Sequence, residues 1–354
     1  MKKEKPAYLM LYEALRQEIV REDWPEGARL PSRRQTARDR GVSMVTVEHS
    51  YELLCQEGYI ESRPRSGYYV IYRSADGFAH PLSRAVSFPE TAASVGRPQT
   101  FPFSVLARTM RRVLTEYGEA ILIKSPGMGC EALRGAISRY LARNRGIRAE
   151  TDQIVIGSGA EYLYGLVVEM LGADRAFAIE QPSYAKIEQV YRAKGIRCDL
   201  LPLGRDGIQT AALRATAASV LHITPYRSFP SGVTASASKR REYLRWAAQD
   251  DRYIVEDDFE SEFSVLRKPE ETVFSQADRE NAIYLNTFSR TVSPALRVGY
   301  MVLPPRLTRL FHERVGFYSC SVPTFEQYVL ATLIDSGDFE RHINRIRRAK
   351  RKQE

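Results

Sequence analysis

The sequence predicts an α/β protein in two parts: an N-terminal winged helix-turn-helix and a larger domain with a mostly parallel central sheet. Three observations lead to this prediction. Capped helical segments and a hairpin-like run fill residues 1–72. Residues 73–100 are rich in Gly, Pro, Ser and Ala and have no periodicity, which is typical of a linker. From residue 101 to residue 354, β-rich and helical stretches alternate.

Composition favours a cytoplasmic protein. The 354 residues are 44% hydrophobic, enough for two or three domains with a substantial core. No stretch reaches the roughly 18 uncharged apolar residues of a membrane span, and the start M-K-K-E-K-P-A-Y lacks the apolar segment of a signal peptide. Four cysteines lie far apart, with no C-x-x-C pair and no nearby His, so we expect reduced thiols and no metal site: Cys55, Cys130, Cys198 and Cys320.

The net charge of +9 is unevenly distributed. Residues 1–73 hold 13 Lys and Arg against 11 Asp and Glu, whereas residues 341–354 hold seven basic residues and one acidic. A solvated helix face is the preferred interpretation of this basic tail, and a tail that contacts DNA is the alternative. A prediction of DNA binding therefore depends on the motifs at the N-terminus.

The first 58 residues predict three helices. Apolar residues recur at helical spacing from Tyr8 to Ile19. After a W-P-E-G turn, Ser32 and Gln35 form a capping box for a second helix, which ends at Gly41. Ser43 caps a third helix that ends at Gly58 and whose inner stripe is Val47, Tyr51 and Leu54.

Two short β-rich runs follow, around the R-P-R-S-G segment of residues 63–67, and predict a hairpin with a basic tip. Three helices followed by a hairpin form a winged helix-turn-helix. Its third helix enters the major groove, and its wing reaches an adjacent groove or the backbone.

The exposed polar residues of this unit are the candidates for DNA contact. We expect phosphate contacts from Arg33, Arg34 and Ser43, and base-edge contacts from Met44, Thr46 and His49. An ordinary solvated histidine explains His49 about equally well. The tip of the wing adds Arg63, Arg65 and Ser66. The run L-P-S-R-R-Q-T-A-R-D-R-G-V-S-M-V-T-V, residues 30–47, resembles the winged helix of the GntR family, and the resemblance extends over residues 5–70.

The second part alternates between strand and helix patterns. The candidate strands are Gln153–Gly157, Arg175–Glu180, Val220–Thr224, Tyr253–Glu256, Ala282–Asn286 and Val298–Leu303. The candidate helices are Gly129–Arg143, Ala160–Leu171, Tyr184–Lys194 and Lys239–Gln249. In such sheets, functional groups lie at the carboxyl ends of the strands.

Four motifs stand at predicted strand ends. I-V-I-G-S-G-A-E-Y-L, residues 154–163, is a strand, a glycine turn and a helix start. Its amides suit a phosphate, although a plain structural turn is about equally expected. E-Q-P-S-Y, residues 180–184, ends on an aromatic ring, and residues 224–234 form a loop shaped by Pro and Gly. E-D-D-F-E-S-E-F, residues 256–263, offers a carboxylate to a protonated ring nitrogen, or is simply an acidic surface turn.

The run N-T-F-S-R-T-V-S-P-A-L-R-V-G-Y, residues 286–300, resembles the cofactor segment of fold-type I pyridoxal-phosphate (PLP) enzymes. In that segment, the lysine after the serine forms a Schiff base with the cofactor. Here Arg290 stands at that position. A Schiff base requires a neutral amine, and a guanidinium stays protonated at any working pH.

Together, the motifs resemble those of MocR-type regulators, in which a GntR-type winged helix is fused to a fold-type I aminotransferase-like domain. Such regulators are dimeric transcription factors that use PLP as an effector, usually without productive transamination. The resemblance implies that Tyr184 stacks on the cofactor ring and that Asp257 meets the pyridine nitrogen. It implies a phosphate site made by Gly159, Ala160, Thr287, Ser289 and Arg297.

Three departures from the family pattern bear on activity. Arg290 replaces the lysine, and Phe259 replaces a tyrosine that bonds the phenolic oxygen of the cofactor. The sequence also stops where the family's helix leads into a small C-terminal domain. We therefore expect PLP binding that is non-covalent at most and no catalytic residues. We expect Arg290 either to pair with Asp257 or to hold an anionic ligand.

The leading hypothesis is a homodimeric, sequence-specific DNA-binding regulator that binds a double-stranded operator. Its inactive aminotransferase-like domain would serve dimerisation and the sensing of a small-molecule effector, PLP or another anion. One alternative is a PLP-dependent aminotransferase with an appended DNA-binding module. Another is a degenerate paralogue that binds neither DNA nor ligand well.

Overall fold

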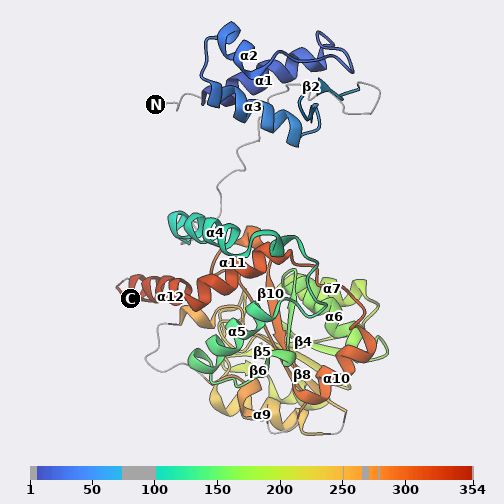
Figure 1. Cartoon of the computed structure of the whole chain (residues 1–354). Helices are drawn as coiled ribbons and strands as arrows, with labels where there is room; N and C mark the ends of the chain where they lie inside the picture. Colours follow the sequence, from blue (N-terminus) through green and yellow to red (C-terminus); the bar gives the residue numbers. More distant parts are fainter. Residues whose placement is uncertain (1–5, 74–100, 250, 265–270, 278–279, 353–354) are drawn as a thin grey trace. The chain divides into compact units, whose positions relative to one another are not determined.

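The computed structural model describes residues 6–73, 101–249, 251–264, 271–277 and 280–352. The chain divides into two compact units, residues 1–92 and 93–354 (Figure 1). Nearly all of the predicted linker, residues 73–100, lies outside the described residues.

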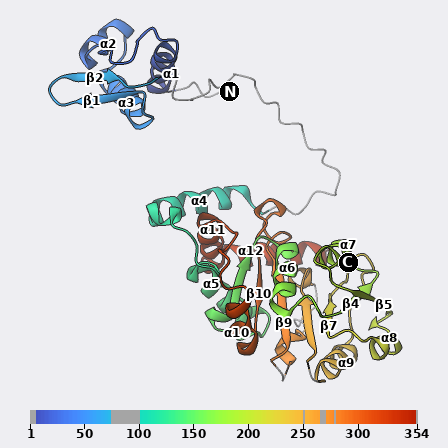
Figure 2. The ribbon, with the colours of Figure 1, turned by 90° about the vertical axis from the view of Figure 1, so that its right-hand side faces the viewer.

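The N-terminal unit consists of three helices and a hairpin, as predicted. The elements are α1 (Ala7–Val20), α2 (Arg33–Arg40), α3 (Met44–Gln56), β1 (Ile60–Arg63) and β2 (Gly67–Val70). The two strands are antiparallel, with Ile60 opposite Val70 and Arg63 opposite Gly67. Figure 2 shows this hairpin beside the helices. Its loop has three residues, and Arg65 at the tip takes the left-handed conformation that such loops use.

The predicted caps position the two helices of the helix-turn-helix. The Ser43 hydroxyl accepts a hydrogen bond from the Thr46 amide at 3.1 Å, and Gly41 ends α2 in the left-handed conformation. The capping box predicted for α2 is wrong in one half. Ser32 accepts from the Gln35 amide, but the Gln35 side chain donates to Asp39 at 2.8 Å instead of accepting from the Ser32 amide.

The core of this unit is made by the inner stripes predicted for α1 and α3. Leu15 and Ile19 of α1 pack with Val47, Tyr51 and Leu54 of α3 in one buried cluster. The Tyr51 hydroxyl, buried among them, donates to the carbonyl of Pro31 at 2.9 Å, so its polar end is satisfied. This packing holds the start of α3 at the surface.

The second unit is built on a mixed, mostly parallel sheet. Among the described residues it has eight strands, in the order β3-β10-β9-β8-β7-β4-β5-β6. The five neighbours from β9 to β5 are parallel, whereas β10 runs antiparallel to both β3 and β9, and β6 runs antiparallel to β5. The strands are β3 (Ile154–Gly157), β4 (Phe177–Gln181), β5 (Cys198–Gly204), β6 (Gly207–Ile208), β7 (Val220–Ile223), β8 (Tyr253–Asp257), β9 (Ala282–Thr287) and β10 (Gly299–Val302).

Helices cover both faces of this sheet. One face packs against α6 (Ala160–Leu171), α7 (Ala185–Ala193) and α10 (Pro305–Arg314). The other packs against α5 (Glu131–Asn144), α11 (Thr324–Asp335), α12 (Asp338–Arg351), α8 (Thr210–Ala215) and α9 (Ala237–Ala247), with α4 (Phe103–Tyr117) over α11. Short 3₁₀ helices are η2 (Gly118–Leu122), η3 (Thr151–Gln153), η4 (Ser261–Phe263), η5 (Phe274–Gln276) and η6 (Pro294–Leu296).

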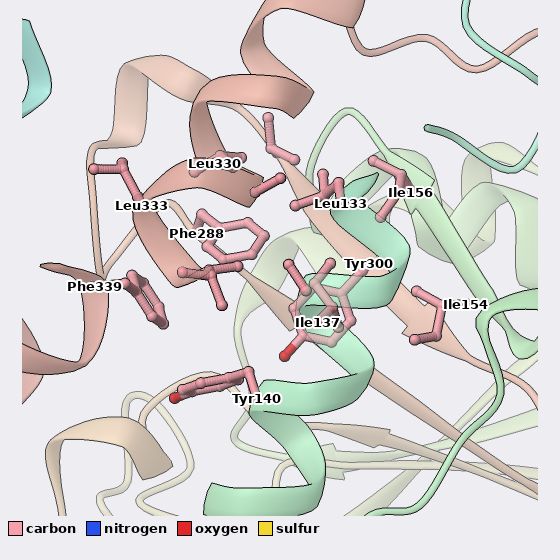
Figure 3. Packing of buried hydrophobic residues seen from close by; sticks show 14 of the residues in the cluster. Leu133, Ile137, Tyr140, Ile154, Ile156, Phe288, Tyr300, Leu330, Leu333 and Phe339 are labelled. Atoms are coloured by element: carbon pink, nitrogen blue, oxygen red, sulfur yellow. The ribbon is translucent and has the colours of Figure 1, made fainter. Parts of the chain in front are cut away.

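Alternation along the strands separates the two cores. Ile154 and Ile156 of β3 point to the α5 and α11 side, whereas Val155 between them points to the α6 side. Figure 3 shows the first of these cores, where Leu133 and Ile137 of α5 meet residues of β10, α11 and α12. Burying a leucine here contributes on the order of 2–3 kcal/mol.

The basic tail is a helix with one buried side. In α12, the side chains Phe339, Ile343 and Ile346 are buried, and most of the arginines and lysines between them are exposed or half-buried. Arg347 also donates to the carbonyl of Glu262 at 2.6 Å. This arrangement agrees with the preferred interpretation, a helix with a solvated basic face.

Several elements were not predicted. β5 contains Asp199 and Pro202, which are unfavourable in strands, and it pairs along its length with β4 but with only two residues of β6. Such a near-edge strand lacks the apolar alternation that marks the buried strands. The sequence interpretation also named no helix for α4, α8, α10 or α11.

Candidate functional site

The start of α3 presents an exposed apolar surface. Met44 is 42% exposed and Val45 is 60% exposed, although both follow the cap of a helix whose other apolar residues are buried or half-buried. The sequence interpretation named Met44 and missed Val45. Val45 lies outside the inner stripe of Val47, Tyr51 and Leu54, and that position was the available sign of its exposure.

Four other predicted contact residues of this region already have partners. Arg33 forms an ion pair with Glu48, one turn into α3. The Thr46 hydroxyl shares a 2.8 Å hydrogen bond with that of Ser43. His49 is exposed, and its ring meets that of Tyr8 edge to face at 5.8 Å between centroids. To contact DNA, each of these side chains would have to share its present partner with the DNA or give that partner up.

The wing carries both paired and unpaired cations. Arg63 pairs with Glu61 at 2.6 Å and lies over the Tyr69 ring at 4.3 Å. The hydroxyls of Ser66 and Tyr69 are 2.7 Å apart. Arg65 at the tip, and Arg34 on α2, are exposed and have no ion pair within the described residues. Among the predicted DNA-contact residues, the unpaired guanidiniums within the described part of the chain thus lie at the wing tip and on α2.

In the second unit, a cavity of about 310 Å³ opens at the carboxyl ends of the parallel strands. All the predicted cofactor-binding residues except Gly159 line it. The lining residues are Ala160, Glu161, Tyr164, Tyr184, Ile187, Thr224, Phe229, Asp257, Phe259, Thr287, Ser289, Arg290, Pro294 and Arg297. The motifs from five separate strand ends, those of β3, β4, β7, β8 and β9, therefore meet in one place.

A buried carboxylate lies deep in this cavity. Asp257, at the end of β8, is 5% exposed and accepts a hydrogen bond from the Tyr164 hydroxyl. The Nε2 atom of His222, on the neighbouring strand β7, lies 3.7 Å from the same Oδ2 and has no hydrogen-bond partner among the described residues. Burial, and then the nearby Asp257 charge, raise the pKa of Tyr164 well above its usual value, so Tyr164 stays protonated and donates.

Tyr164 and His222 were missed by the sequence interpretation. Tyr164 stands four residues after Ala160, one helical turn into α6, so it lies on the side of that helix that faces the glycine turn. The place of His222 depends on the parallel register of β7 and β8, which sets His222 opposite Val255. A single sequence does not reveal that register.

The phosphate side of the cavity is formed by the start of α6 and by Arg297. The Arg297 guanidinium pairs with Glu161 at 3.1 Å, and Lys186 pairs with the same carboxylate at 2.6 Å. The hydrogen bond from Lys186 lowers the pKa of Glu161 despite its partial burial. A Cβ atom on Gly159 would lie 3.2 Å from Arg297 Nη2, so glycine permits this close approach.

One detail of the predicted phosphate cup is wrong. The amide of Gly159 is not free, because it donates to the carbonyl of Gly157 at 2.8 Å. The first amides of α6, beginning with Ala160, have no acceptor within the helix, and Ala160 lines the cavity. Thr287 and Ser289 add hydroxyl groups to the same cavity.

Arg290 lines the cavity and pairs with Glu260, not with Asp257. Its guanidinium forms an ion pair with Glu260 and lies 4.9 Å from the centroid of the Phe259 ring. Arg227 approaches the other oxygen of Glu260 at 3.6 Å. The expected pairing with Asp257 is therefore wrong: Tyr164 occupies that carboxylate, and Glu260 is the anion available at the cavity mouth.

The lining of this cavity is suited to bind a planar, anionic ligand. It offers such a ligand an aromatic wall (Tyr184), a buried carboxylate and two arginines. Every lining residue belongs to the described part of the chain, and no lysine is among them. The nucleophilic amine that covalent PLP chemistry requires is thus not provided by the lining.

The described residues contain no helix suited to cross a membrane and no side-chain cluster suited to hold a metal ion. Every helix there is too short or too polar to cross a membrane. No group of three or more His, Cys, Asp or Glu side chains in those segments is arranged to hold a metal ion.

Known proteins match the N-terminal unit alone, nearly the whole chain, or most of the second unit. The pattern of the bacterial regulatory proteins of the gntR family matches residues 7–70. The chain is 29% identical to the uncharacterized HTH-type transcriptional regulator YdeL of Bacillus subtilis, over 98% of this chain and 77% of that protein. It is also 29% identical to the probable rhizopine catabolism regulatory protein MocR of Rhizobium meliloti, over 97% of this chain and 74% of that protein.

Among solved structures, the second unit resembles aminotransferases. The kynurenine aminotransferase of Pyrococcus horikoshii, solved with PMP, matches with a TM-score of 0.65 and 26% sequence identity. The match covers 71% of this chain and 64% of that enzyme, so the chain spans less than two thirds of the enzyme's length.

Proposed function

Since the chain is a MocR-type regulator of the GntR family, we propose that it controls transcription as a DNA-binding homodimer whose aminotransferase-like domain senses a phosphate-bearing ligand without catalysis. The ligand we propose is PLP or a similar planar anion, held non-covalently. The observation that carries the proposal is the arginine–carboxylate pair of Arg290 and Glu260, in the cavity where the resemblance expects a reactive lysine.

The N-terminal unit supports sequence-specific DNA binding. The exposed start of α3 offers Met44, Val45 and Thr46 to base edges. Arg34 and Arg65 are exposed and unpaired among the described residues, so they are ready to contact phosphates. We propose that Arg33 and Arg63 contribute less, because their glutamate partners compete with phosphate.

The residues of the cavity fit PLP apart from covalent attachment. The first amides of α6, with Thr287, Ser289 and Arg297, would hold the phosphate. Asp257 keeps Oδ1 for a protonated ring nitrogen, because Tyr164 and His222 both approach Oδ2. Bound to a lysine, PLP would supply an electron sink. The guanidinium of Arg290 stays protonated and offers an anionic substituent a hydrogen-bonding partner instead.

Ligand binding in this cavity requires a change of ion-pair partners. Arg297 is held by Glu161, and Arg290 by Glu260, so a ligand phosphate or carboxylate competes with a protein carboxylate at each point. These pairs are half exposed, and exposed pairs contribute only about 0–1 kcal/mol each. Exchanging a protein carboxylate for a ligand anion therefore costs little free energy. We propose that this exchange links ligand binding to the positions of the loops that carry Glu260 and Arg290.

Exposed apolar side chains support the homodimer. Phe103 on α4 is 80% exposed, Leu122 in η2 is 81% exposed, and Phe317 after α10 is 75% exposed. Contiguous apolar patches commonly mark an interface, and we propose that these side chains belong to one. Sedimentation at micromolar concentration should give a dimer, and a stable monomer would contradict this part of the proposal.

The proposal is tested with the full chain and duplex DNA. Sequences selected from a random duplex pool are labelled, and their dissociation constants are measured by fluorescence anisotropy with and without saturating PLP. We expect PLP to change the affinity by about 5–150-fold, the usual range of coupling between two sites. Arg297→Gln should abolish the response to PLP and leave the affinity of the ligand-free protein unchanged.

The matched control is Arg309→Gln, an exposed arginine on α10 that does not line the cavity. This variant should respond to PLP as the wild type does. Failure to enrich any DNA sequence would contradict the regulator. An affinity that stays the same, within about twofold, with and without PLP would contradict the sensing role.

A further inference from the structure

A second cavity, of about 320 Å³, lies between α8 and α9. It is at the amino ends of the parallel strands, whereas the first cavity is at their carboxyl ends. Arg252 immediately precedes β8 and lines this cavity, whereas Asp257 ends β8 and lines the first. A five-residue strand spans about 15 Å, so the two cavities are separate sites.

Three arginines from three elements converge on this second cavity. Arg214 comes from α8, Arg245 from the last turn of α9, and Arg252 from the segment before β8. None of the three forms an ion pair within the described residues. This contrasts with Arg290 and Arg297 of the first cavity, both of which have carboxylate partners.

One carboxylate also lines the cavity, and it is already neutralised. Glu242 accepts from Lys239 Nζ at 2.8 Å and from the Thr210 hydroxyl at 3.1 Å. The positive charge of the three arginines is therefore left uncompensated around one small volume. Like charges that share a cavity repel each other, and a bound anion relieves that repulsion.

Trp246 gives an independent sign of a ligand. Its side chain lines the cavity and is 6% exposed, yet its Nε1–H has no hydrogen-bond partner in the described part of the chain. Buried donors in native proteins are nearly always satisfied. Arg252 lies over the same indole ring, with its guanidinium carbon 4.6 Å from the ring centroid.

We infer that the cavity between α8 and α9 binds an oligophosphate group, such as that of a nucleoside di- or triphosphate or of pyrophosphate. Guanidiniums bind phosphate oxygens through paired N–H donors, and three of them match a chain of more than one phosphoryl group. The indole N–H supplies one further donor. Arg252 already covers one face of the Trp246 ring, so the phosphate groups rather than an aromatic base carry the recognition.

Trp246 also reports on its own site. The chain has two tryptophans, and the other, Trp24, lies in the N-terminal unit, where its Nε1 donates to Glu18. In full-length Trp24→Phe, the emission therefore comes from Trp246 alone. We expect a saturable change in emission when inorganic pyrophosphate is added at constant ionic strength, and a weaker affinity for inorganic phosphate.

The decisive variants are made in that background. Arg214→Gln combined with Arg245→Gln should weaken pyrophosphate binding by at least about tenfold, because two of the three cations are lost. Arg241→Gln is the matched control: it lies on the exposed side of α9, outside this cavity, and should change the affinity by less than about twofold. Arg297→Gln, in the first cavity, should also leave pyrophosphate binding unchanged. A melting temperature for each variant confirms folding, and Arg214→Gln alone provides a second, milder test.

The inference is overturned if millimolar pyrophosphate produces no saturable response. It is overturned equally if the double variant binds as tightly as the Arg241→Gln control. A response of Trp246 to duplex DNA but not to pyrophosphate would also overturn it, because the site would then contact a nucleic-acid backbone. These outcomes do not depend on PLP binding or on operator recognition.

Discussion

Two arginines of the winged helix and two of the first cavity differ in how their charge is compensated. Arg34 and Arg65 are exposed and unpaired among the described residues, whereas Arg290 and Arg297 are each held by a glutamate. An unpaired surface cation can attract a phosphate at long range and at little cost. A paired one must first exchange its partner.

This difference predicts two kinds of anion binding in one chain. Contacts with DNA should be governed by salt, because they release counterions from the phosphate backbone. Ligand binding in the cavity should be governed by the local carboxylates Glu161 and Glu260, which set how readily the arginines become available. Four predictions are given from the largest effect to the smallest, and the first and third of them test this contrast directly.

The largest effect concerns salt. A dimer that makes about 6–10 phosphate contacts should lose roughly 10³–10⁵ in DNA affinity between about 50 and 200 mM salt. Arg65→Ala and Arg34→Ala should weaken binding to all sequences and reduce the salt slope by about 1 per lost contact. Arg63→Ala should do less, because Glu61 already holds Arg63. Anisotropy titrations over this salt range provide the measurement, and equal slopes for all four proteins would disprove the contrast.

A buried carboxylate without a cation should dominate the pH dependence of stability. Glu180 is 3% exposed and accepts a 2.6 Å hydrogen bond from Ser228; burial raises its pKa from 4.5 to about 8. The folded state thus keeps a proton that the unfolded state loses near pH 4.5. This bound proton stabilises the folded state fully below pH 4.5, and the stabilisation is lost as the pH rises toward 8. Glu180→Gln should raise the free energy of unfolding at pH 8 by about 1–3 kcal/mol and flatten its fall between pH 5 and 8.

Urea titrations at several pH values measure this effect. Glu313→Gln, at an exposed position on α10, serves as the control and should leave the pH slope as it is in the wild type. A Glu180→Gln protein that is less stable than the wild type at pH 8 would mean that the carboxylate is ionised and stabilising in the folded state.

Removing the carboxylate that holds Arg290 should strengthen ligand binding. In Glu260→Gln, both Arg290 and Arg227 lose their anionic partner, so we expect PLP to bind about tenfold more tightly than it does to the wild type. Equilibrium dialysis with PLP measures the change, and Glu313→Gln again serves as the control. Weaker binding by Glu260→Gln would show that Glu260 contacts the ligand or supports the cavity.

The smallest effect should come from Thr46. Its hydroxyl bonds to that of Ser43 at the start of α3, so Thr46→Ala removes one base-edge contact and loosens one helix cap. We expect a change of about 1 kcal/mol in the relative affinities for different sequences, with little change in the salt slope. Selection from a random pool with each protein measures this preference. Identical preferences would remove Thr46 from the recognition surface.

Much of this architecture could be predicted, because local patterns encode it. The caps Ser43 and Gly41 and the inner stripe of α3 define the helix-turn-helix within a few residues. The cavity lining was predicted because parallel strands bring their carboxyl ends to one edge, which gathers motifs that are distant in sequence.

The ion pairs and the floor of the cavity could not be predicted. The partner of Arg290 depends on how the loop after β8 turns back to place Glu260, thirty residues earlier in the chain, at the cavity mouth. His222 reaches Asp257 only through the register of β7 and β8. Both contacts are set by tertiary geometry, for which a single sequence contains no periodic sign.

We propose that the cavity binds its ligand without covalent chemistry, because Arg290 stands where the resemblance expects the reactive lysine. Mass spectrometry of peptides after incubation with PLP and reduction with borohydride tests it directly. The wild type should carry no phosphopyridoxyl group, whereas Arg290→Lys should carry one at position 290 and show no measurable transamination. A phosphopyridoxyl group on another lysine of the wild type, such as Lys186 near the cavity rim, would contradict the account. So would an Arg290→Lys protein that binds PLP and gains no adduct.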